Sequence, residues 1–456
     1  MLKKYWRKRV CFLPALILMI GTFAACGQEQ AETANNSEDT SAVSATDSAA
    51  PGDQSKNPGD YSGTLAMWAW DQNYVDQMGE EFKKIYTNVK IDVTPVQSLD
   101  YLQKLQTTTA AGGILPDVLF AEMSWRGKAF AVDVWENLEN APYNFDRSLI
   151  YDYLPALTSN EKGEIIGIEQ TLSPAAMVYR RDLAREYLGT DDPKQLSEMF
   201  KDWDSFISKG LEVKQKSNGK VYMLSSLGDL ITIICNQDTT TVYDGNSLNI
   251  TGSMKNSLEL MVKFRDSGVV DKLDQWSPPW NASYALGKTI FYPAANWSAQ
   301  FVIKPNDKDG SGKWGFMVPP GGPFSWGGTA MGISKQSKNK EAAWEFIKWC
   351  TLTREGAQVS KEKLDFYVPL KEVYDDPSFA TSKDDYFAGQ DLGQFWFTDI
   401  VPNMQAKPIS KYDNVISDAN MLIAKAINAD KKMTADKALE NLIKEIKNKL
   451  PDVDVK

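Results

Sequence analysis

The sequence predicts an α/β fold in which strands of parallel sheets alternate with helices. From Tyr61 onwards, short apolar runs of strand length alternate with segments whose apolar residues recur every three or four positions. The last third of the chain consists mostly of such helical segments, and no internal repeat or phosphate-binding loop is present. The order strand, helix, strand, helix, strand is typical of a parallel sheet with covering helices.

The individual elements follow from local patterns. Strands are predicted at residues 64–70 (TLAMWAW), 90–96 (KIDVTPV) and 116–122 (PDVLFAE). Between them the spacing predicts a helix that Asn73 can cap, and a second helix over residues 101–111 that the following glycines end. Ligands bind such sheets at the carboxyl ends of the strands, and these ends carry Trp70, Asp71 and Glu122.

Two later segments are predicted to be amphipathic helices. The segment NKEAAWEFIKWC (339–350) carries Trp344, Ile347 and Cys350 on one face, and TADKALENLIKEIKNKL (434–450) carries a stripe of leucines and isoleucines. Such stripes pack against a core.

The N-terminus has the pattern of an export signal. A basic stretch is followed by an apolar run, CFLPALILMIGTFAA, which has the length of a signal-peptide core rather than of a spanning helix. Small residues then lead into Cys26, and this resembles a bacterial lipobox with Phe23 where leucine is usual. We therefore expect a signal peptide over residues 1–25 and a lipid on Cys26; an ordinary signal peptide with a chance cysteine is the alternative. Residues 27–60 contain no aromatic, leucine, isoleucine or methionine side chain. This composition predicts that residues 26–60 form a disordered tether that begins at the lipidated Cys26.

The composition excludes several classes of function. The chain has no histidine, which rules out histidine bases, Ser-His-Asp triads and histidine-ligated metals. The net charge of -10 does not favour a nucleic-acid partner, because proteins that bind nucleic acids usually carry an excess of basic residues. The cysteines fit no metal or CxxC spacing, and we expect Cys235 and Cys350 to be free thiols. No cofactor or metal is expected.

One stretch, WSPPWNASYALGKTIFYPAANWSAQF (276–301), is unusually rich in aromatic residues and holds a single charge, Lys288. Within it, Phe291 and Tyr292 read as buried strand. Trp276 and Trp280 belong to a proline-rich loop that forms either the rim of a cleft or ordinary packing.

Several motifs together resemble the extracellular solute-binding proteins of ABC sugar importers, the family that includes the maltose-binding protein. They are spread over most of residues 61–450 and include WAWDQNY, YLQKLQTTTAAGGILPDVLF, MVYRRDL, GKTIFYPAANW, GKWGFMVPPGG and SWGGTAMGISKQSKNKEAAWEFIKW. The resemblance implies two α/β lobes, each a mainly parallel sheet flanked by helices, that close on a ligand like a hinged trap. Lobe 1 would hold residues 61–174 and 330–395, and lobe 2 would hold residues 175–329 and 396–456.

The resemblance also implies site residues. The sugar-stacking tryptophan of the family corresponds to Trp297, and its WGG motif to Trp326, Gly327 and Gly328. The Pro-Trp-Asp that many relatives carry is replaced here by Glu169-Gln170-Thr171, so we expect the preferred sugar to differ.

From position alone, Trp70 would add a second ring, and Asp71 and Glu122 would bind hydroxyls. The alternatives are a helix cap for Asp71 and a residue of a solvated loop for Glu122. Trp125 is either a platform or a core residue. Aromatic rings cover the apolar face of a pyranose, and carboxylates accept its hydroxyl hydrogens.

These features predict a monomeric, non-enzymatic protein on the outer face of the bacterial cell membrane. It would capture a sugar, more consistent with an oligosaccharide, and deliver it to a membrane permease. A surface adhesin and, less consistent with the sequence, a secreted glycoside hydrolase using two carboxylates such as Asp71 and Glu122 are the alternatives.

Overall fold

The computed structural model describes residues 56–456, which form one compact unit. The expected signal peptide and the lipidated Cys26 lie outside the described residues. The tether was expected to reach Asp60, but Pro58–Asp60 already forms a 3-10 turn, and Lys56 pairs with Glu341. Within residues 56–456, no helix has both the length and the apolarity needed to cross a bilayer.

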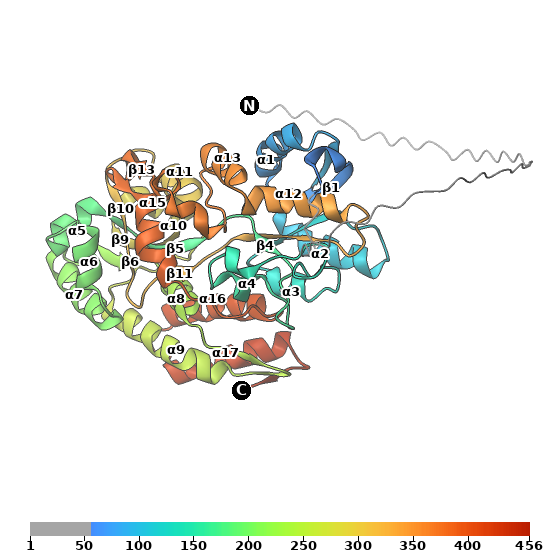
Figure 1. Cartoon of the computed structure of the whole chain (residues 1–456). Helices are drawn as coiled ribbons and strands as arrows, with labels where there is room; N and C mark the ends of the chain where they lie inside the picture. The colour runs from blue at the N-terminus through green and yellow to red at the C-terminus, as the bar shows by residue number, and fades with distance from the viewer. Residues whose placement is uncertain (1–55) are drawn as a thin grey trace, which may run out of the picture. The chain divides into compact units, whose positions relative to one another are not determined.

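Two five-stranded sheets organise this unit (Figure 1). The first sheet contains, in spatial order, β2 (Val89–Pro95), β1 (Gly63–Ala69), β3 (Val118–Glu122), β12 (Thr329–Ile333) and β4 (Ile168–Glu169). The second contains β10 (Trp314–Met317), β5 (Pro174–Arg180), β9 (Thr289–Ala295) and β6 (Tyr222–Leu224), with β11 (Phe324–Ser325) beside β5.

The sheets are mixed rather than mainly parallel, which corrects that part of the expectation. The pairs β1–β2, β1–β3 and β6–β9 are parallel, as the β-α-β-α-β order predicts. The pairs that involve β4, β5 and β12 are antiparallel. The reason is that the chain passes from the first sheet to the second between β4 and β5 and returns between β11 and β12, so these strands run against their neighbours.

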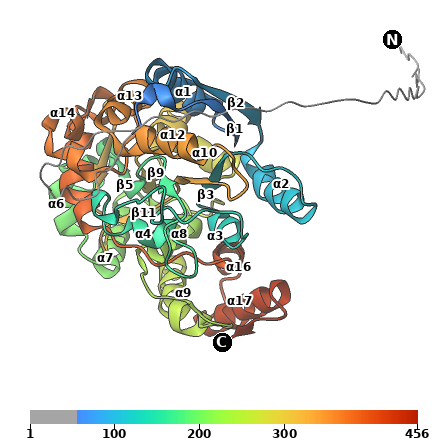
Figure 2. The ribbon, with the colours of Figure 1, turned by 45° about the vertical axis from the view of Figure 1, so that its right-hand side comes forward.

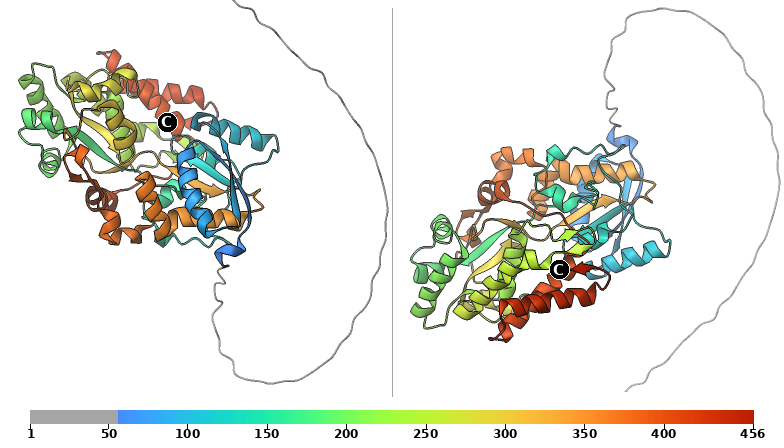
Figure 3. Two further views of the ribbon diagram at one scale, coloured as in Figure 1. Left: turned by 90° about the horizontal axis from the view of Figure 1, so that it is seen from above. Right: turned by 90° about the horizontal axis from the view of Figure 1, so that it is seen from below.

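Helices cover both sheets (Figures 1 and 3). Around the first sheet lie α1 (Gln72–Ile85), α2 (Ser98–Ala110), α3 (Arg126–Phe130), α4 (Leu154–Thr158), α12 (Lys340–Leu352) and α13 (Arg354–Leu364). Around the second lie α5 (Arg181–Leu188), α6 (Pro193–Met199), α7 (Trp203–Lys216), α8 (Leu227–Gln237), α9 (Ile250–Ser267) and α10 (Pro278–Leu286).

The C-terminal helices α16 (Asp413–Ala429) and α17 (Ala435–Lys449) pack on α8 and α9. Short elements complete the unit: α11 (Lys304–Asn306), α14 (Pro377–Ala380), α15 (Leu392–Gln394), the pair β13 (Lys383–Asp384) and β14 (Gln390–Asp391), and a small sheet of β7 (Tyr243–Asp244), β8 (Ser247–Leu248) and β15 (Asp454–Val455).

Local sequence explains why these elements form. Helix α1 buries Tyr74, Val75, Met78 and Phe82, the spacing of a single helix face. Its cap is Asp71, whose side chain accepts a hydrogen bond from the backbone of Tyr74, and not Asn73 as the sequence suggested. Strand β9 is buried along its whole length, which confirms Phe291 and Tyr292 as core strand.

The core of the unit consists of two large hydrophobic clusters. One contains the first sheet, its helices and one face of the second sheet; the other contains the rest of the second sheet with α8, α9, α16 and α17. Cys350 is buried in the first cluster, and both Cys235 and Cys350 are free, as expected.

Candidate functional site

Three tryptophans come together where the chain returns from the second sheet to the first. The ring centroids of Trp297 and Trp326 are 5.1 Å apart, and Trp276 lies 5.7 Å from Trp326 and 6.4 Å from Trp297. The indole of Trp276 is 48% exposed although it is a large apolar ring. We call these three residues the tryptophan cluster. An exposed aromatic surface of this kind is suited to contact with a flat apolar face.

Backbone geometry at the WGG motif brings the cluster together. The indole nitrogen of Trp297 donates a hydrogen bond to the carbonyl oxygen of Trp326 over 2.9 Å. Gly327, with φ of 83°, adopts a conformation that favours glycine, and a Cβ there would lie 3.0 Å from the Trp297 indole nitrogen. At Gly328, whose φ is 111°, a Cβ would lie 3.1 Å from the side-chain oxygens of both Glu169 and Ser173. The two glycines therefore allow the return segment to lie against Trp297.

The backbone of Trp276 is also strained. Its φ is 67°, a value that a bulky L-residue rarely adopts. Its neighbour Trp280 is fully buried and donates its indole hydrogen to Asp229, 2.9 Å away. Burial raises the pKa of Asp229 to about 7, although Ser225, Trp280 and the backbone donate hydrogen bonds to it. The stretch that contains these residues thus splits into a buried anchor, Trp280, and an exposed ring, Trp276.

A cavity of about 310 Å³ adjoins the tryptophan cluster. Its walls come from the end of β3, from α8, from the return segment after β11, from residues 405–409 and from α16, which can be followed in Figure 2. The polar and aromatic side chains of the lining include Glu122, Ser124, Thr232, Cys235, Asp238, Trp326, Lys407, Asp413, Asn414, Asp418 and Asn420. Both sheets therefore contribute to one hollow, through β3 on one side and β11 on the other.

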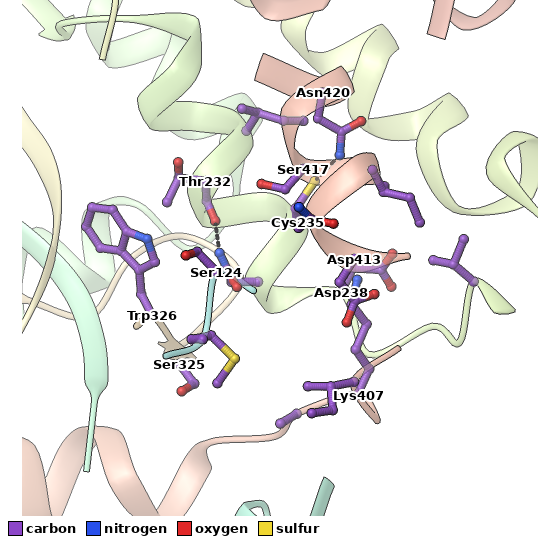
Figure 4. Close-up of a pocket in the computed structure, with 18 of the residues that line it drawn as sticks. Ser124, Thr232, Cys235, Asp238, Ser325, Trp326, Lys407, Asp413, Ser417 and Asn420 are labelled. Atoms are coloured by element: carbon purple, nitrogen blue, oxygen red, sulfur yellow. Dashed lines mark hydrogen bonds between the residues drawn. The ribbon is translucent and has the colours of Figure 1, made fainter. Parts of the chain in front are cut away.

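The polar wall of the cavity is rich in hydrogen-bond acceptors (Figure 4). The side chain of Asp413 accepts hydrogen bonds from the backbone and hydroxyl of Ser410, and burial raises its pKa above the usual range. The side chains of Asn414 and Asn420 each have an amide oxygen with no hydrogen-bond partner among the described residues. Buried polar atoms are normally paired, so these two oxygens are exceptions beside the cavity.

Cys235 also lines the cavity but is not a reactive group. Its sulfur accepts a hydrogen bond from the amide of Asn420 at 3.6 Å. Burial raises the pKa of the Cys235 thiol to about 11, so it is protonated at neutral pH. A thiol in that state is a poor nucleophile and a poor metal ligand. Among the described residues, no cluster of three or more Cys, Asp or Glu side chains could hold a metal ion.

A buried ion pair supports the end of β3. Arg126 is fully buried and forms a two-pronged salt bridge with Glu169, which is 3% exposed. The same guanidinium donates to the carbonyl oxygens of Ala121 and Leu157, each over 3.1 Å. Because Ala121 directly precedes Glu122, this arginine holds the strand end that supplies the cavity wall.

The structure brings some of the sequence-predicted site residues together and leaves others apart. Glu122, Trp326 and Gly327 line the cavity, and Trp297 contacts Trp326. The carboxylate of Glu122 accepts hydrogen bonds from the backbone and hydroxyl of Ser124.

Trp70, Trp125 and Asp71 do not line this cavity. Trp70 and Trp125 pack edge to face at 5.6 Å, and both contact Tyr101. Trp125 is 7% exposed, and its indole nitrogen has no hydrogen-bond partner among the described residues. Asp71 caps α1, which is the alternative interpretation of that residue. These three residues lie at the carboxyl ends of β1 and β3, as predicted, but outside the lining of the cavity.

No motif in the sequence indicates the contribution of α16 to the cavity. Asp413, Asn414 and Asn420 follow a segment without a motif, and their place depends on α16 packing against α8. Trp276 was recognised as a candidate for the rim, and its exposure favours that alternative over ordinary packing.

Two mixed sheets covered by helices, two antiparallel crossing segments and a cavity at the crossing that Trp326 and several carboxylates line indicate a ligand-binding protein. The model of the bacterial extracellular solute-binding protein family matches residues 77–388, more than half of the chain. The chain therefore belongs to this family, and the resemblance seen in the sequence is confirmed.

Comparisons with individual proteins agree. A lactose-binding protein of Rhizobium radiobacter is 23% identical over 367 residues, which cover 73% of this chain and 81% of that protein. A solved extracellular solute-binding protein of family 1 superposes with a TM-score of 0.77 at 22% identity, covering 84% of this chain and 99% of the other. The sugar-binding protein MalE of Xanthomonas citri gives a TM-score of 0.68 at 20% identity, with coverage of 85% and 98%. These likenesses confirm the two-lobed binding-protein fold.

Proposed function

We propose that this protein captures a carbohydrate outside the cell and delivers it to the permease of an ABC importer. The observation that carries the proposal is the tryptophan cluster beside an acceptor-rich cavity at the crossing between the sheets. A pyranose has an apolar face and a rim of hydroxyls. An indole covers the face, and carboxylate and amide oxygens accept hydrogen bonds from the rim.

The proposed roles follow from position. Trp326, supported by Trp297 and Trp276, lies against the sugar face. Glu122 from the first sheet and Asp413 from α16 accept hydroxyl hydrogens. Each such bond contributes on the order of 1 kcal/mol, and more when the partner is charged. Trp70, Asp71 and Trp125 remain proposals for a more distant part of an extended ligand, which is why an oligosaccharide is preferred.

Closure of two lobes around the ligand is part of the proposal. Two of the lobe boundaries proposed from the sequence have support, because the chain passes between the sheets near residues 174 and 329. The boundary near residue 395 is proposed from the resemblance alone. A ligand that contacts both sides of the crossing favours the closed state, because it gains those contacts only there.

The family is extracellular by description, and we propose that a lipid on Cys26 anchors this monomeric protein to the outer face of the membrane. Two named relatives support a sugar ligand, since one is a lactose-binding protein and another a sugar-binding MalE. The role is capture without catalysis. Hydrolysis by Asp71 and Glu122 is not favoured, because Asp71 is engaged as a helix cap and lies outside the cavity.

A thermal-shift screen against mono- and oligosaccharides, followed by calorimetry, tests the proposal. A true ligand raises the melting temperature with concentration, because it binds only the folded state. The Trp326→Ala variant should lose most of the affinity. The matched control is Trp203→Ala, since Trp203 lies on α7 away from the cavity and is also part-buried. Unchanged affinity in Trp326→Ala, or no shift with any sugar, contradicts the proposal.

A further inference from the structure

The charges that line the cavity are strongly unbalanced. Glu122, Asp238, Asp413 and Asp418 contribute four carboxylates, and Lys407 is the one cationic side chain among the described lining residues. None of these four carboxylates forms an ion pair with a lysine or arginine of residues 56–456. Lys407 interacts electrostatically with Asp413 and offsets part of this charge, and the four carboxylates still outnumber the single cationic side chain of the wall.

The carboxylates of the wall add a second constraint, because they accept hydrogen bonds and cannot donate them. Asn420 is 7% exposed, lines the cavity and has an amide oxygen without a partner among the described residues. The amide oxygen of Asn414 is likewise buried and has no hydrogen-bond partner among the described residues. Carboxylates and amide oxygens accept hydrogen bonds and need donors. A ligand that brings donors satisfies this wall, and a ligand that brings further acceptors leaves it unsatisfied.

We propose that this cavity selects sugars by charge, accepting neutral sugars and amino sugars and rejecting sugars that carry a carboxylate, sulfate or phosphate group. This inference rests on the proposed function and adds the class of ligand. Hydroxyl groups of a neutral sugar donate to the carboxylates, and the ammonium of an amino sugar adds a favourable charge. An anionic group brings acceptors only and is repelled by like charges in a partly enclosed space, where salt screens less than at an open surface.

The test compares sugars of the same ring configuration that carry a neutral, a cationic or an anionic group. The panel contains glucose, glucosamine and glucuronate, the three corresponding galactose compounds, and the 1,4-linked disaccharides of each. Dissociation constants are measured by calorimetry on the full folded unit in about 50 mM NaCl with EDTA present, where surface charges are weakly screened. We expect at least about tenfold weaker binding of the acidic member of any series that binds, which corresponds to about 1.4 kcal/mol.

A pair of variants links the effect to the cavity. Asp238→Asn combined with Asp418→Asn removes two of the carboxylates, and neither side chain bonds to another element in a way that the fold requires. The control combines Asp244→Asn with Glu259→Gln, two exposed acidic residues of the same region that do not line the cavity. The cavity variant should reduce the ratio of the dissociation constants for the acidic and the neutral sugar several-fold. The control variant should leave this ratio unchanged.

The outcomes separate the two levels of the argument. If an acidic sugar binds as tightly as its neutral counterpart, or more tightly, the charge inference is wrong while the sugar-binding function stands. If both double variants change the ratio of dissociation constants equally, the cavity carboxylates do not cause the discrimination, and the inference is also wrong. If no sugar of any series binds, the proposed function itself fails.

Discussion

Removing the charge of Glu169 should destabilise the protein strongly. The Glu169→Gln change keeps the shape of the side chain but leaves the fully buried guanidinium of Arg126 without its counter-charge. Breaking a buried pair in this way costs about 3–5 kcal/mol. The upper part of that range is not expected, because Arg126 keeps its bonds to the carbonyl oxygens of Ala121 and Leu157. We therefore expect a loss of about 3 kcal/mol.

Urea unfolding, monitored by circular dichroism, measures this loss as a shift of the urea midpoint to lower concentration with an unchanged m-value. The control is Glu81→Gln, which removes a carboxylate from the part-exposed pair with Lys363. Such a pair contributes about 0–1 kcal/mol. If Glu169→Gln destabilises no more than Glu81→Gln, the buried pair is not what holds the end of β3. The same variant should also weaken sugar binding, since Ala121 precedes Glu122 in the cavity wall.

Three further predictions concern the surroundings of the site. Between about pH 4 and 7 the folded protein holds a proton on Asp229 that the unfolded chain has released. This group therefore lowers the free energy of unfolding as pH rises, by up to roughly 4 kcal/mol. The Asp229→Asn variant should lose this pH dependence when unfolding is measured across the same pH range. Gly327→Ala should cost about 1–3 kcal/mol in melting experiments, because φ is positive and a Cβ would press on the Trp297 indole, whereas equal stability would contradict the proposed role of this glycine. In residues 56–456, the fully buried thiol of Cys350 should react with a thiol reagent near neutral pH only after unfolding, because burial hides it and raises its pKa; rapid reaction at Cys350 in the native protein would contradict this burial.

Much of the first sheet could be predicted because its signals are local. The strands at β1, β2 and β3 agree with the sequence to within two residues at each end, and the helices between them have regular apolar spacing. Strand direction in the rest of the sheets depends on where the chain crosses, and this is a property of the whole topology. A local pattern in MVYRRDL or TAMGI does not contain that information, so the mixed sheets could not be deduced from periodicity.

The site divides in the same way. Trp326 and Gly327 carry a recognisable motif, and Glu122 ends a predicted strand, so these residues were found. Asp413 and Asn420 were missed because they are polar residues on a helix whose neighbours are distant in the sequence. Asp71 shows the opposite case, since a carboxylate after a strand also caps a helix, and the local hydrogen bond to Tyr74 accounts for it.

A crystal structure of the protein with the tightest-binding sugar of the screen tests the central claim most directly. The account predicts a pyranose within about 4 Å of the Trp326 indole, with hydroxyl groups donating to Glu122 or Asp413. A sugar bound instead against Trp70 and Trp125, with the cavity beside Trp326 left unoccupied, would contradict it.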